Sequence, residues 1–161
     1  MSSQLNRASE IQTERLAAGT RARILGAIDE QCPLERLATV DFPLTLDLAE
    51  VDFINSTGLR AWIHFLRSIR GRGQLTVERC SERMVMQLSM VSDAHAGLTV
   101  TSFYAPYVCD ACGHEERVLL EVQSHFPIGR RSRLPAFGCP DCRQPMSFAE
   151  QPDRYLLFLD H

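Results

Sequence analysis

The fold is decided by residues 44–71, LTLDLAEVDFINSTGLRAWIHFLRSIRG. Its first half is dense in apolar residues, which predicts a buried strand over 44–48 and a buried edge formed by Val51, Phe53 and Ile54. In its second half, apolar residues recur every three to four positions, which predicts an amphipathic helix over 57–70. The stretch therefore predicts a strand, a turn and a helix in direct succession.

The strand and the helix are joined by the polar turn Asn55-Ser56-Thr57-Gly58. We expect Ser56 to be the helix N-cap, because its hydroxyl can accept a hydrogen bond from the free N–H groups of the first turn. These N–H groups and the positive end of the helix dipole suit an anion or an acidic side chain of a partner. The sequence places no histidine or carboxylate to activate the hydroxyl, so we expect no enzyme activity.

Strands and helices alternate on both sides of this stretch. Apolar patterns and turn residues predict strands at 11–16, 22–28, 74–78 and 98–103, and helices at 33–38 and 82–90. The second of these helices is expected to be capped by Ser81 and to bury Met84. The resulting order, β-β-α-β-α-β-α-β, predicts an α/β fold with a mixed sheet and crossover helices packed on it.

Several short motifs are similar to those of a known family. They are Gly26-Ala27-Ile28-Asp29, Asp47-Leu48, Phe53-Ile54-Asn55-Ser56-Thr57-Gly58-Leu59, Gly73 and Leu75. Together with the element order, they resemble a STAS domain, the family of anti-sigma-factor antagonists and related adaptors, over residues 9–104. The resemblance implies a mixed sheet flanked by helices, function by binding protein partners, and no catalysis. It also implies that a partner kinase phosphorylates Ser56, with Thr57 beside it, to switch binding.

Two features depart from the pattern of that family. The residue before the first serine of the turn is usually Asp and is Asn55 here, so the turn keeps a hydrogen-bonding side chain but loses a negative charge. A kinase that requires this carboxylate would not phosphorylate Ser56. The family usually ends in a helix after the last strand, whereas here the composition changes at Ala105-Pro106 and a cysteine-rich segment follows.

This segment contains two pairs of cysteines, Cys109-x-x-Cys112 and Cys139-x-x-Cys142. Each pair presents two thiolates on one side of a tight loop, and two such loops complete a tetrahedral zinc site. A redox dithiol is the alternative for a single pair, but two pairs together favour zinc. Residues 107–161 therefore resemble a zinc ribbon that holds about one structural zinc per chain.

The rest of the module supports a structural metal. Strands are expected at 118–122 and 155–159, but large apolar residues are few, so the module would be marginal without its metal. Chelation is therefore expected to release the zinc and to unfold residues 107–161. His114 directly follows the first cysteine pair, and we expect it to be a neighbour of the site because four thiolates already complete the coordination.

The overall composition is that of an ordinary soluble chain of 161 residues with a net charge of −3. No apolar run has transmembrane length and the N-terminus is polar, so we expect a cytoplasmic protein with no membrane insertion. Cys32 and Cys80 are expected to be buried free thiols. The negative net charge argues against a general nucleic-acid binder, although Arg130, Arg131 and Arg133 offer a loop that can contact phosphate.

Three functions remain open from the sequence. The first is a signalling or scaffolding adaptor that binds protein partners, such as a kinase-type anti-sigma factor or a scaffold, through the turn at Ser56. The second is a nucleic-acid-associated regulator that uses the zinc ribbon and its arginine-rich loop, which salt-dependent binding to DNA or RNA would reveal. The third is a phosphorylation-independent STAS subunit of a larger assembly, such as a transport complex. The sequence also leaves a homo-oligomer open.

Overall fold

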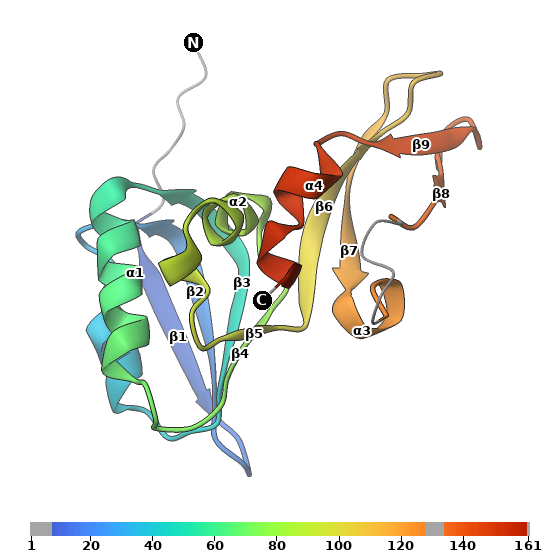
Figure 1. The fold of residues 1–161 in the computed structure, drawn as a ribbon. Helices are drawn as coiled ribbons and strands as arrows, with labels where there is room; N and C mark the ends of the chain where they lie inside the picture. Colours follow the sequence, from blue (N-terminus) through green and yellow to red (C-terminus); the bar gives the residue numbers. More distant parts are fainter. Residues whose placement is uncertain (1–7, 128–133, 161) are drawn as a thin grey trace.

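The computed structural model describes residues 8–127 and 134–160. These residues form a five-stranded sheet and a four-stranded sheet together with several helices, which confirms the α/β class (Figure 1). Within the described ranges, no helix is long and apolar enough to cross a membrane. The arginines of the predicted phosphate-contacting loop, Arg130, Arg131 and Arg133, lie outside the described residues.

The larger sheet comes from the N-terminal part of the chain. Its strands, in spatial order, are β1 (Glu10–Arg15), β2 (Thr20–Ile28), β3 (Leu44–Ile54), β4 (Leu75–Glu78) and β5 (Thr99–Val100). β1 and β2 form an antiparallel hairpin, and β2 to β5 pair in parallel. The prediction of a mixed sheet is therefore confirmed.

Helices connect the parallel strands and cover one face of this sheet. They are the 3-10 helix η1 (Leu34–Thr39), α1 (Ser56–Ser68), α2 (Glu82–Met90) and the 3-10 helix η2 (Ser92–Ala94). Parallel neighbours need such crossovers because a tight turn cannot join them. On β3, the alternating residues Leu44, Leu46 and Leu48 are fully buried beneath the helices. Ser81 caps α2 as predicted, and its hydroxyl accepts a hydrogen bond from the backbone N–H of Met84 at 3.3 Å.

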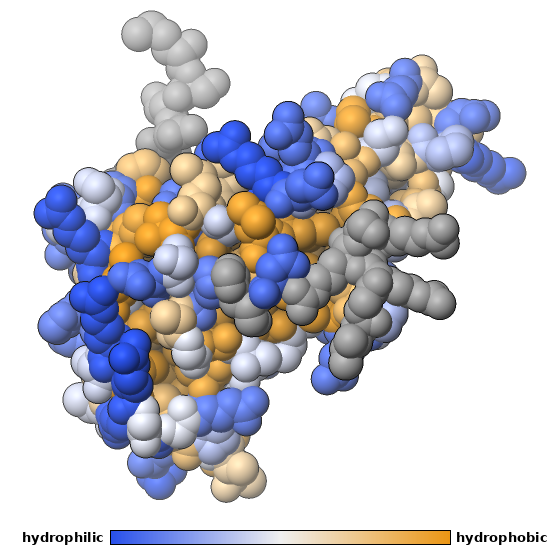
Figure 2. All heavy atoms as spheres, viewed as in Figure 1, coloured by the Kyte–Doolittle hydropathy of each residue, from blue (hydrophilic) through white to orange (hydrophobic). Residues whose placement is uncertain are grey.

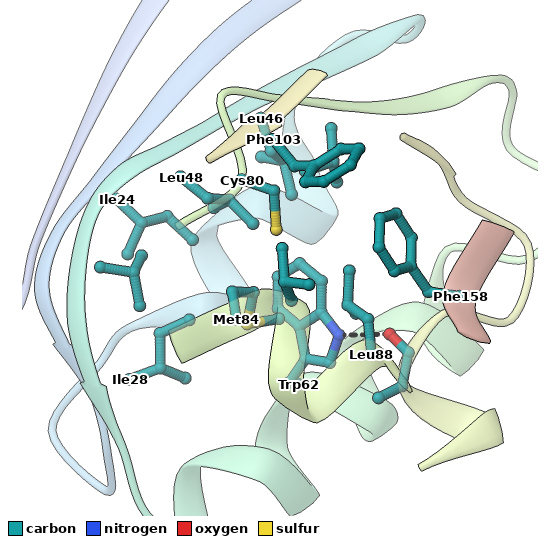
Figure 3. Packing of buried hydrophobic residues seen from close by; sticks show 14 of the residues in the cluster. Ile24, Ile28, Leu46, Leu48, Trp62, Cys80, Met84, Leu88, Phe103 and Phe158 are labelled. Atoms are coloured by element: carbon teal, nitrogen blue, oxygen red, sulfur yellow. Dashed lines mark hydrogen bonds between the residues drawn. The ribbon is translucent and has the colours of Figure 1, made fainter. Parts of the chain in front are cut away.

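Part of one apolar cluster lies between the sheet and its helices (Figure 3). Trp62 of α1 is fully buried in it, and its indole N–H donates to the carbonyl oxygen of Ala94 at 2.7 Å. Cys80 and Met84 are fully buried as well, as the sequence predicts. Met86, on the outer side of α2, is 39% exposed. Only a narrow face of α2 is therefore buried, and this face includes Met84 but not Met86.

The opposite face of the larger sheet carries charged side chains. The carboxylate of Asp47, on β3, is 2% exposed and lies among three guanidinium groups. It accepts a hydrogen bond from Nε of Arg79 at 3.2 Å, and it lies 3.6 Å from Arg21 and 3.5 Å from Arg23. These cations offset the free-energy cost of burying the carboxylate, so this face needs no covering helix.

The smaller sheet comes from the C-terminal part of the chain. Its strands, in spatial order, are β7 (Glu115–Glu121), β6 (Ser102–Val108), β9 (Pro145–Phe148) and β8 (Phe137–Gly138), and α3 (Val122–His125) follows β7. The single strand predicted over 98–103 is divided into β5 and β6, one in each sheet. The composition change at Ala105-Pro106 therefore falls inside a continuous strand. The strand predicted over 118–122 exists as β7 but begins earlier.

The prediction of a closing strand over 155–159 was wrong. This segment forms part of α4 (Pro152–Tyr155) and the 3-10 helix η3 (Leu157–Asp160). Pro152 is at the first helical position, where its missing N–H costs no hydrogen bond. Tyr155 and Phe158 are buried against Phe103, with ring centroids 6.5 and 5.1 Å away. The apolar run is thus buried at helical spacing rather than at the alternating spacing of a strand.

Several contacts join the two sheets. After β4, the backbone N–H of Cys80 donates to the carbonyl oxygen of Ser102 at 3.0 Å, at the start of β6. The hydroxyl of Ser89, on α2, donates to the carbonyl oxygen of Tyr155 at 2.7 Å. Figure 2 shows apolar residues over the region of α2 and the C-terminal helices, and hydrophilic residues along the outer side of α1. The division into domains at 9–104 and 107–161 stays a prediction, and one apolar cluster has members in both parts.

Candidate metal centre and helix-start turn

The structure brings the four predicted metal ligands together at one end of the smaller sheet. Cys109 and Cys112 lie in the turn between β6 and β7, and Cys139 and Cys142 lie between β8 and β9. Their four Sγ atoms all lie within 4.8 Å of one another. Two of the contacts cross between the two loops, at 3.4 Å for Cys109 and Cys142 and at 3.6 Å for Cys112 and Cys139. Four thiols at these distances can hold a metal ion.

The two cysteine loops have the same backbone hydrogen bonds. The fifth residue of each loop, Gly113 or Arg143, donates its N–H to the carbonyl oxygen of the first cysteine, at 2.8 and 2.9 Å. Both residues have a left-handed backbone conformation, with φ of 77° for Gly113 and 64° for Arg143. The second loop accepts this conformation without a glycine, which indicates that the tight turn is held by its surroundings. We call these two loops, 109–114 and 139–144, the knuckles.

The pKa values of the thiols indicate why the cluster favours a cation. The backbone N–H of Cys112, assisted by the thiol of Cys142, lowers the pKa of Cys109 to about 7. The N–H of His114 acts in the same direction on Cys112, but desolvation and the neighbouring thiols raise the pKa of Cys112 to about 12. Thiolates at these distances repel one another, and a bound divalent cation removes the conflict because all ligand thiols must then be deprotonated.

A second layer of contacts ties the knuckles to each other. Nδ1 of His114 lies 2.9 Å from Oδ2 of Asp141 in the opposite knuckle. The hydroxyl of Ser147, on β9 just after the second knuckle, donates a hydrogen bond to Oδ2 of Asp110 in the first knuckle at 2.8 Å. Among the described residues, the group that can hold a metal consists of the four cysteines, so His114 is a neighbour of the site as predicted. The sequence analysis missed both aspartates, although each stands inside a cysteine pair.

The start of α1 differs from the prediction in the identity of its cap. Asn55, not Ser56, is the N-cap: its backbone is extended, and its Oδ1 accepts a hydrogen bond from the N–H of Gly58 at 2.7 Å. The expected cap at Ser56 was wrong because the helix begins one residue earlier than the pattern indicated. Ser56 is the first helical residue, and it and Thr57 are exposed.

Two further side chains lie beside this turn: Glu30, which the sequence analysis did not place there, and Phe53, near the end of β3, which it expected to be buried. Nδ2 of Asn55 donates to Oε2 of Glu30 at 2.9 Å, and this hydrogen bond lowers the pKa of the exposed Glu30 carboxyl. Phe53, expected to be buried at the edge of the turn, is 45% exposed. The turn therefore presents two hydroxyls, a fixed carboxylate and an aromatic ring to solvent.

Gly58 has a structural role in the same turn. It is buried where the first turn of α1 passes over the end of β2, and a Cβ atom added there would overlap the carbonyl oxygen of Ile28. The backbone N–H of Asn55 also donates to this oxygen, at 3.4 Å. Of the four predicted turn residues, Ser56 and Thr57 are thus exposed to solvent, Asn55 caps the helix, and Gly58 permits its close approach to the sheet.

Replacing Asn55 by Ala should lower the free energy of unfolding by about 1 kcal/mol, because the cap oxygen for the Gly58 N–H is lost. Ser56→Ala is the matched control and should change it by less than about 0.5 kcal/mol, because Ser56 does not cap the helix. Urea denaturation of both variants measures the difference. Equal losses in the two variants would contradict the assignment of the cap.

Comparisons with protein family models, with curated proteins and with solved structures find no match to this chain. The resemblances to a STAS domain and to a zinc ribbon therefore rest on its motifs, its element order and its cysteine cluster. The function is accordingly argued from the chemistry of the metal centre and of the turn.

Proposed function

We propose that this chain is a non-enzymatic signalling or scaffolding adaptor. Its N-terminal α/β part is STAS-like and binds a protein partner through the turn at Ser56, and its four cysteines hold a structural zinc ion. The order of β1 to β5 with their crossover helices supports the STAS-like fold. The partner is a protein of the kinase or scaffold type that the family resemblance implies.

The main support for this proposal is that Ser56 is exposed and is not the cap of α1. Because Asn55 caps α1, the hydroxyl of Ser56 can be contacted or modified without removing the cap. An exposed aromatic ring, here Phe53, is a common anchor in protein interfaces. An exposed serine at the start of α1 and an exposed aromatic ring three residues earlier, on β3, therefore favour a protein-binding surface over a purely structural one.

The local charges make Ser56 suitable for a phosphorylation switch. A phosphate there would add nearly two negative charges at the positive end of the helix dipole, which stabilises them. Arg60, exposed and four residues further along α1, is on the same helix face and can pair with the phosphate. Glu30 beside the turn supplies a carboxylate that Asn55 itself lacks. An acidic partner surface would be repelled after phosphorylation.

Zinc is the metal that best fits the four thiols. A tetrahedral ion with zinc–sulfur bonds of about 2.3 Å requires sulfur atoms about 3.8 Å apart. Two sulfur pairs lie at 3.4 and 3.6 Å, and all lie within 4.8 Å. Cys109, Cys112, Cys139 and Cys142 would complete the coordination and leave no position for a catalytic water. This supports a structural ion rather than a catalytic one.

Replacing Ser56 by Asp should change the capture of protein partners by about tenfold, because it places a charge at the centre of the docking surface. Ser56→Asn is the matched control, since it has a similar shape without the charge, and it should bind like the wild type. Affinity capture from the native cell with quantitative mass spectrometry measures the effect. Equal thermal midpoints for both variants would show that the fold is intact. Unchanged capture by Ser56→Asp would contradict the switch.

A further inference from the structure

We propose that the four-cysteine cluster is also an oxidation site, at which a hydroperoxide converts the ligand thiolates into two disulfides that cross between the knuckles, Cys112–Cys139 and Cys109–Cys142. This inference rests on the proposed zinc site. It goes beyond a structural role for the metal, because it assigns a covalent modification with a defined pairing to the same residues.

The exposure of the four cysteines sets where oxidation begins. Cys112 is exposed and Cys142 is half-buried, whereas Cys109 and Cys139 are 0% and 2% exposed. Susceptibility to peroxide follows thiolate character and access, and zinc keeps all four ligands as thiolates. The oxidant therefore reacts first at Cys112, at the tip of the turn between β6 and β7.

The distances between sulfur atoms set which disulfides follow. Sγ of Cys112 lies 3.6 Å from Sγ of Cys139, and Sγ of Cys109 lies 3.4 Å from Sγ of Cys142. Each contact joins one knuckle to the other, so a small approach of the two loops closes both bonds. The backbone hydrogen bonds within each knuckle hold its own loop fixed. These two contacts between the knuckles therefore favour the crossed pairing.

The chemistry balances with hydrogen peroxide as the oxidant. The Cys112 thiolate attacks the peroxide, the O–O bond breaks, and the thiolate becomes a sulfenic acid while hydroxide leaves and takes a proton to form water. The Cys139 thiolate then attacks the sulfenic sulfur, an S–S bond forms, the S–O bond breaks, and a second hydroxide leaves as water. A second peroxide oxidises Cys109 and Cys142 in the same way, and zinc leaves because its thiolate ligands are consumed.

The other two cysteines make the reaction selective. Cys32 is 6% exposed and Cys80 is 0% exposed. Burial, assisted by the nearby carboxylate of Asp29, raises the pKa of the Cys32 thiol to about 11, and burial raises the pKa of Cys80 further. Both remain neutral thiols at pH 7, so they serve as internal controls within the same molecule.

The expected consequence is a zinc-free form in which the knuckles stay joined. The two disulfides would take over the link that zinc provides between the turn after β6 and the segment from β8 to β9. The oxidised, zinc-free protein should therefore keep the smaller sheet, whereas the reduced, zinc-free protein should lose it. Peroxide would thus release zinc without unfolding the chain.

The test is a peroxide titration of the full-length, zinc-loaded protein at pH 7. Zinc content is measured before the titration. A protein that holds no zinc at this stage would contradict the proposed zinc site, independently of the result of the oxidation. Zinc release is followed with a chromogenic chelator, sulfenic acid is trapped with dimedone, and disulfides are mapped by mass spectrometry of unreduced peptides. We expect complete release at one peroxide per disulfide, trapping first at Cys112, and the two crossed disulfides. Cys32→Ser should behave like the wild type.

Three results would overturn the inference. Zinc that stays bound at this peroxide stoichiometry would exclude the oxidation site. Disulfides within the pairs, Cys109–Cys112 and Cys139–Cys142, would exclude the crossed pairing. Oxidation of Cys32 or Cys80 before the cluster would exclude its selectivity.

Discussion

Removing the metal with a strong chelator should release about one zinc per chain and unfold the smaller sheet. Through the ion, the four cysteines would join the turn after β6 to the short strands β8 and β9, which pair over only a few residues. Without the ion, no bond joins the four sulfur atoms, and the knuckles can separate. Metal analysis of the reduced protein and near-ultraviolet circular dichroism before and after chelation measure the two effects.

The structure narrows the sequence prediction that chelation unfolds all of residues 107–161. Tyr155 and Phe158 are buried against Phe103, and this packing does not involve the metal. We therefore expect hydrogen exchange to become fast first over 137–148 and later in α4 and η3. Cys139→Ser should reproduce the loss, and Cys32→Ser should not. A reduced, metal-free protein with the same exchange pattern as the metal-loaded form would contradict a structural role for the ion.

Replacing Gly58 by Ala should lower the free energy of unfolding by about 3 kcal/mol, since overpacking against a rigid neighbour costs this much. Alanine normally favours a helix by about 1 kcal/mol over glycine. Here the added Cβ would overlap the backbone carbonyl oxygen of Ile28, which no side-chain rotation can move away. The start of α1 must then lift from β2, and the turn at Ser56 moves with it. Urea denaturation measures the loss of stability.

Gly138→Ala is the matched control for this substitution. No heavy atom lies within 4 Å of the Cβ position at Gly138, and the backbone there is accessible to any residue. Its effect on the free energy of unfolding should stay within about 0.5 kcal/mol. Equal effects of the two substitutions would contradict the close approach of α1 to β2.

The order of the elements could be predicted because the local patterns are strong. Residues 44–71 combine a dense apolar run with a three-to-four spacing, and the turn between them is polar. The cysteine pairs were equally informative, since their spacing alone predicts a common metal centre. The first prediction depends on residues that are close in sequence, and the second depends on the spacing of a single residue type, cysteine.

The errors arose where tertiary packing decides the outcome. The run YLLFL at 155–159 fits a strand or a helix by composition, and the packing of Tyr155 and Phe158 on Phe103 selects the helix. The strand predicted over 98–103 divides because β6 turns to pair with β7 in the other sheet. No pattern within these segments contains that information.

The surface of the turn was only partly predictable for the same reason. Asn55 and Ser56 are both good cap residues, and local sequence does not decide between them. Glu30 reaches the turn because β2 and β3 are parallel neighbours, with Ile28 beside Ile54. A contact between residues 25 positions apart follows from the sheet register and not from a motif.

The docking turn is tested most directly by photo-crosslinking in the native cell. A photoreactive amino acid is placed at Thr57, which is exposed on the first turn of α1, and in a second variant at Gln12, which is exposed on β1. We predict a discrete covalent adduct with a partner protein from position 57 and none of that mass from position 12. The absence of an adduct at 57, or the same adduct from both positions, would contradict a partner-binding surface at Ser56.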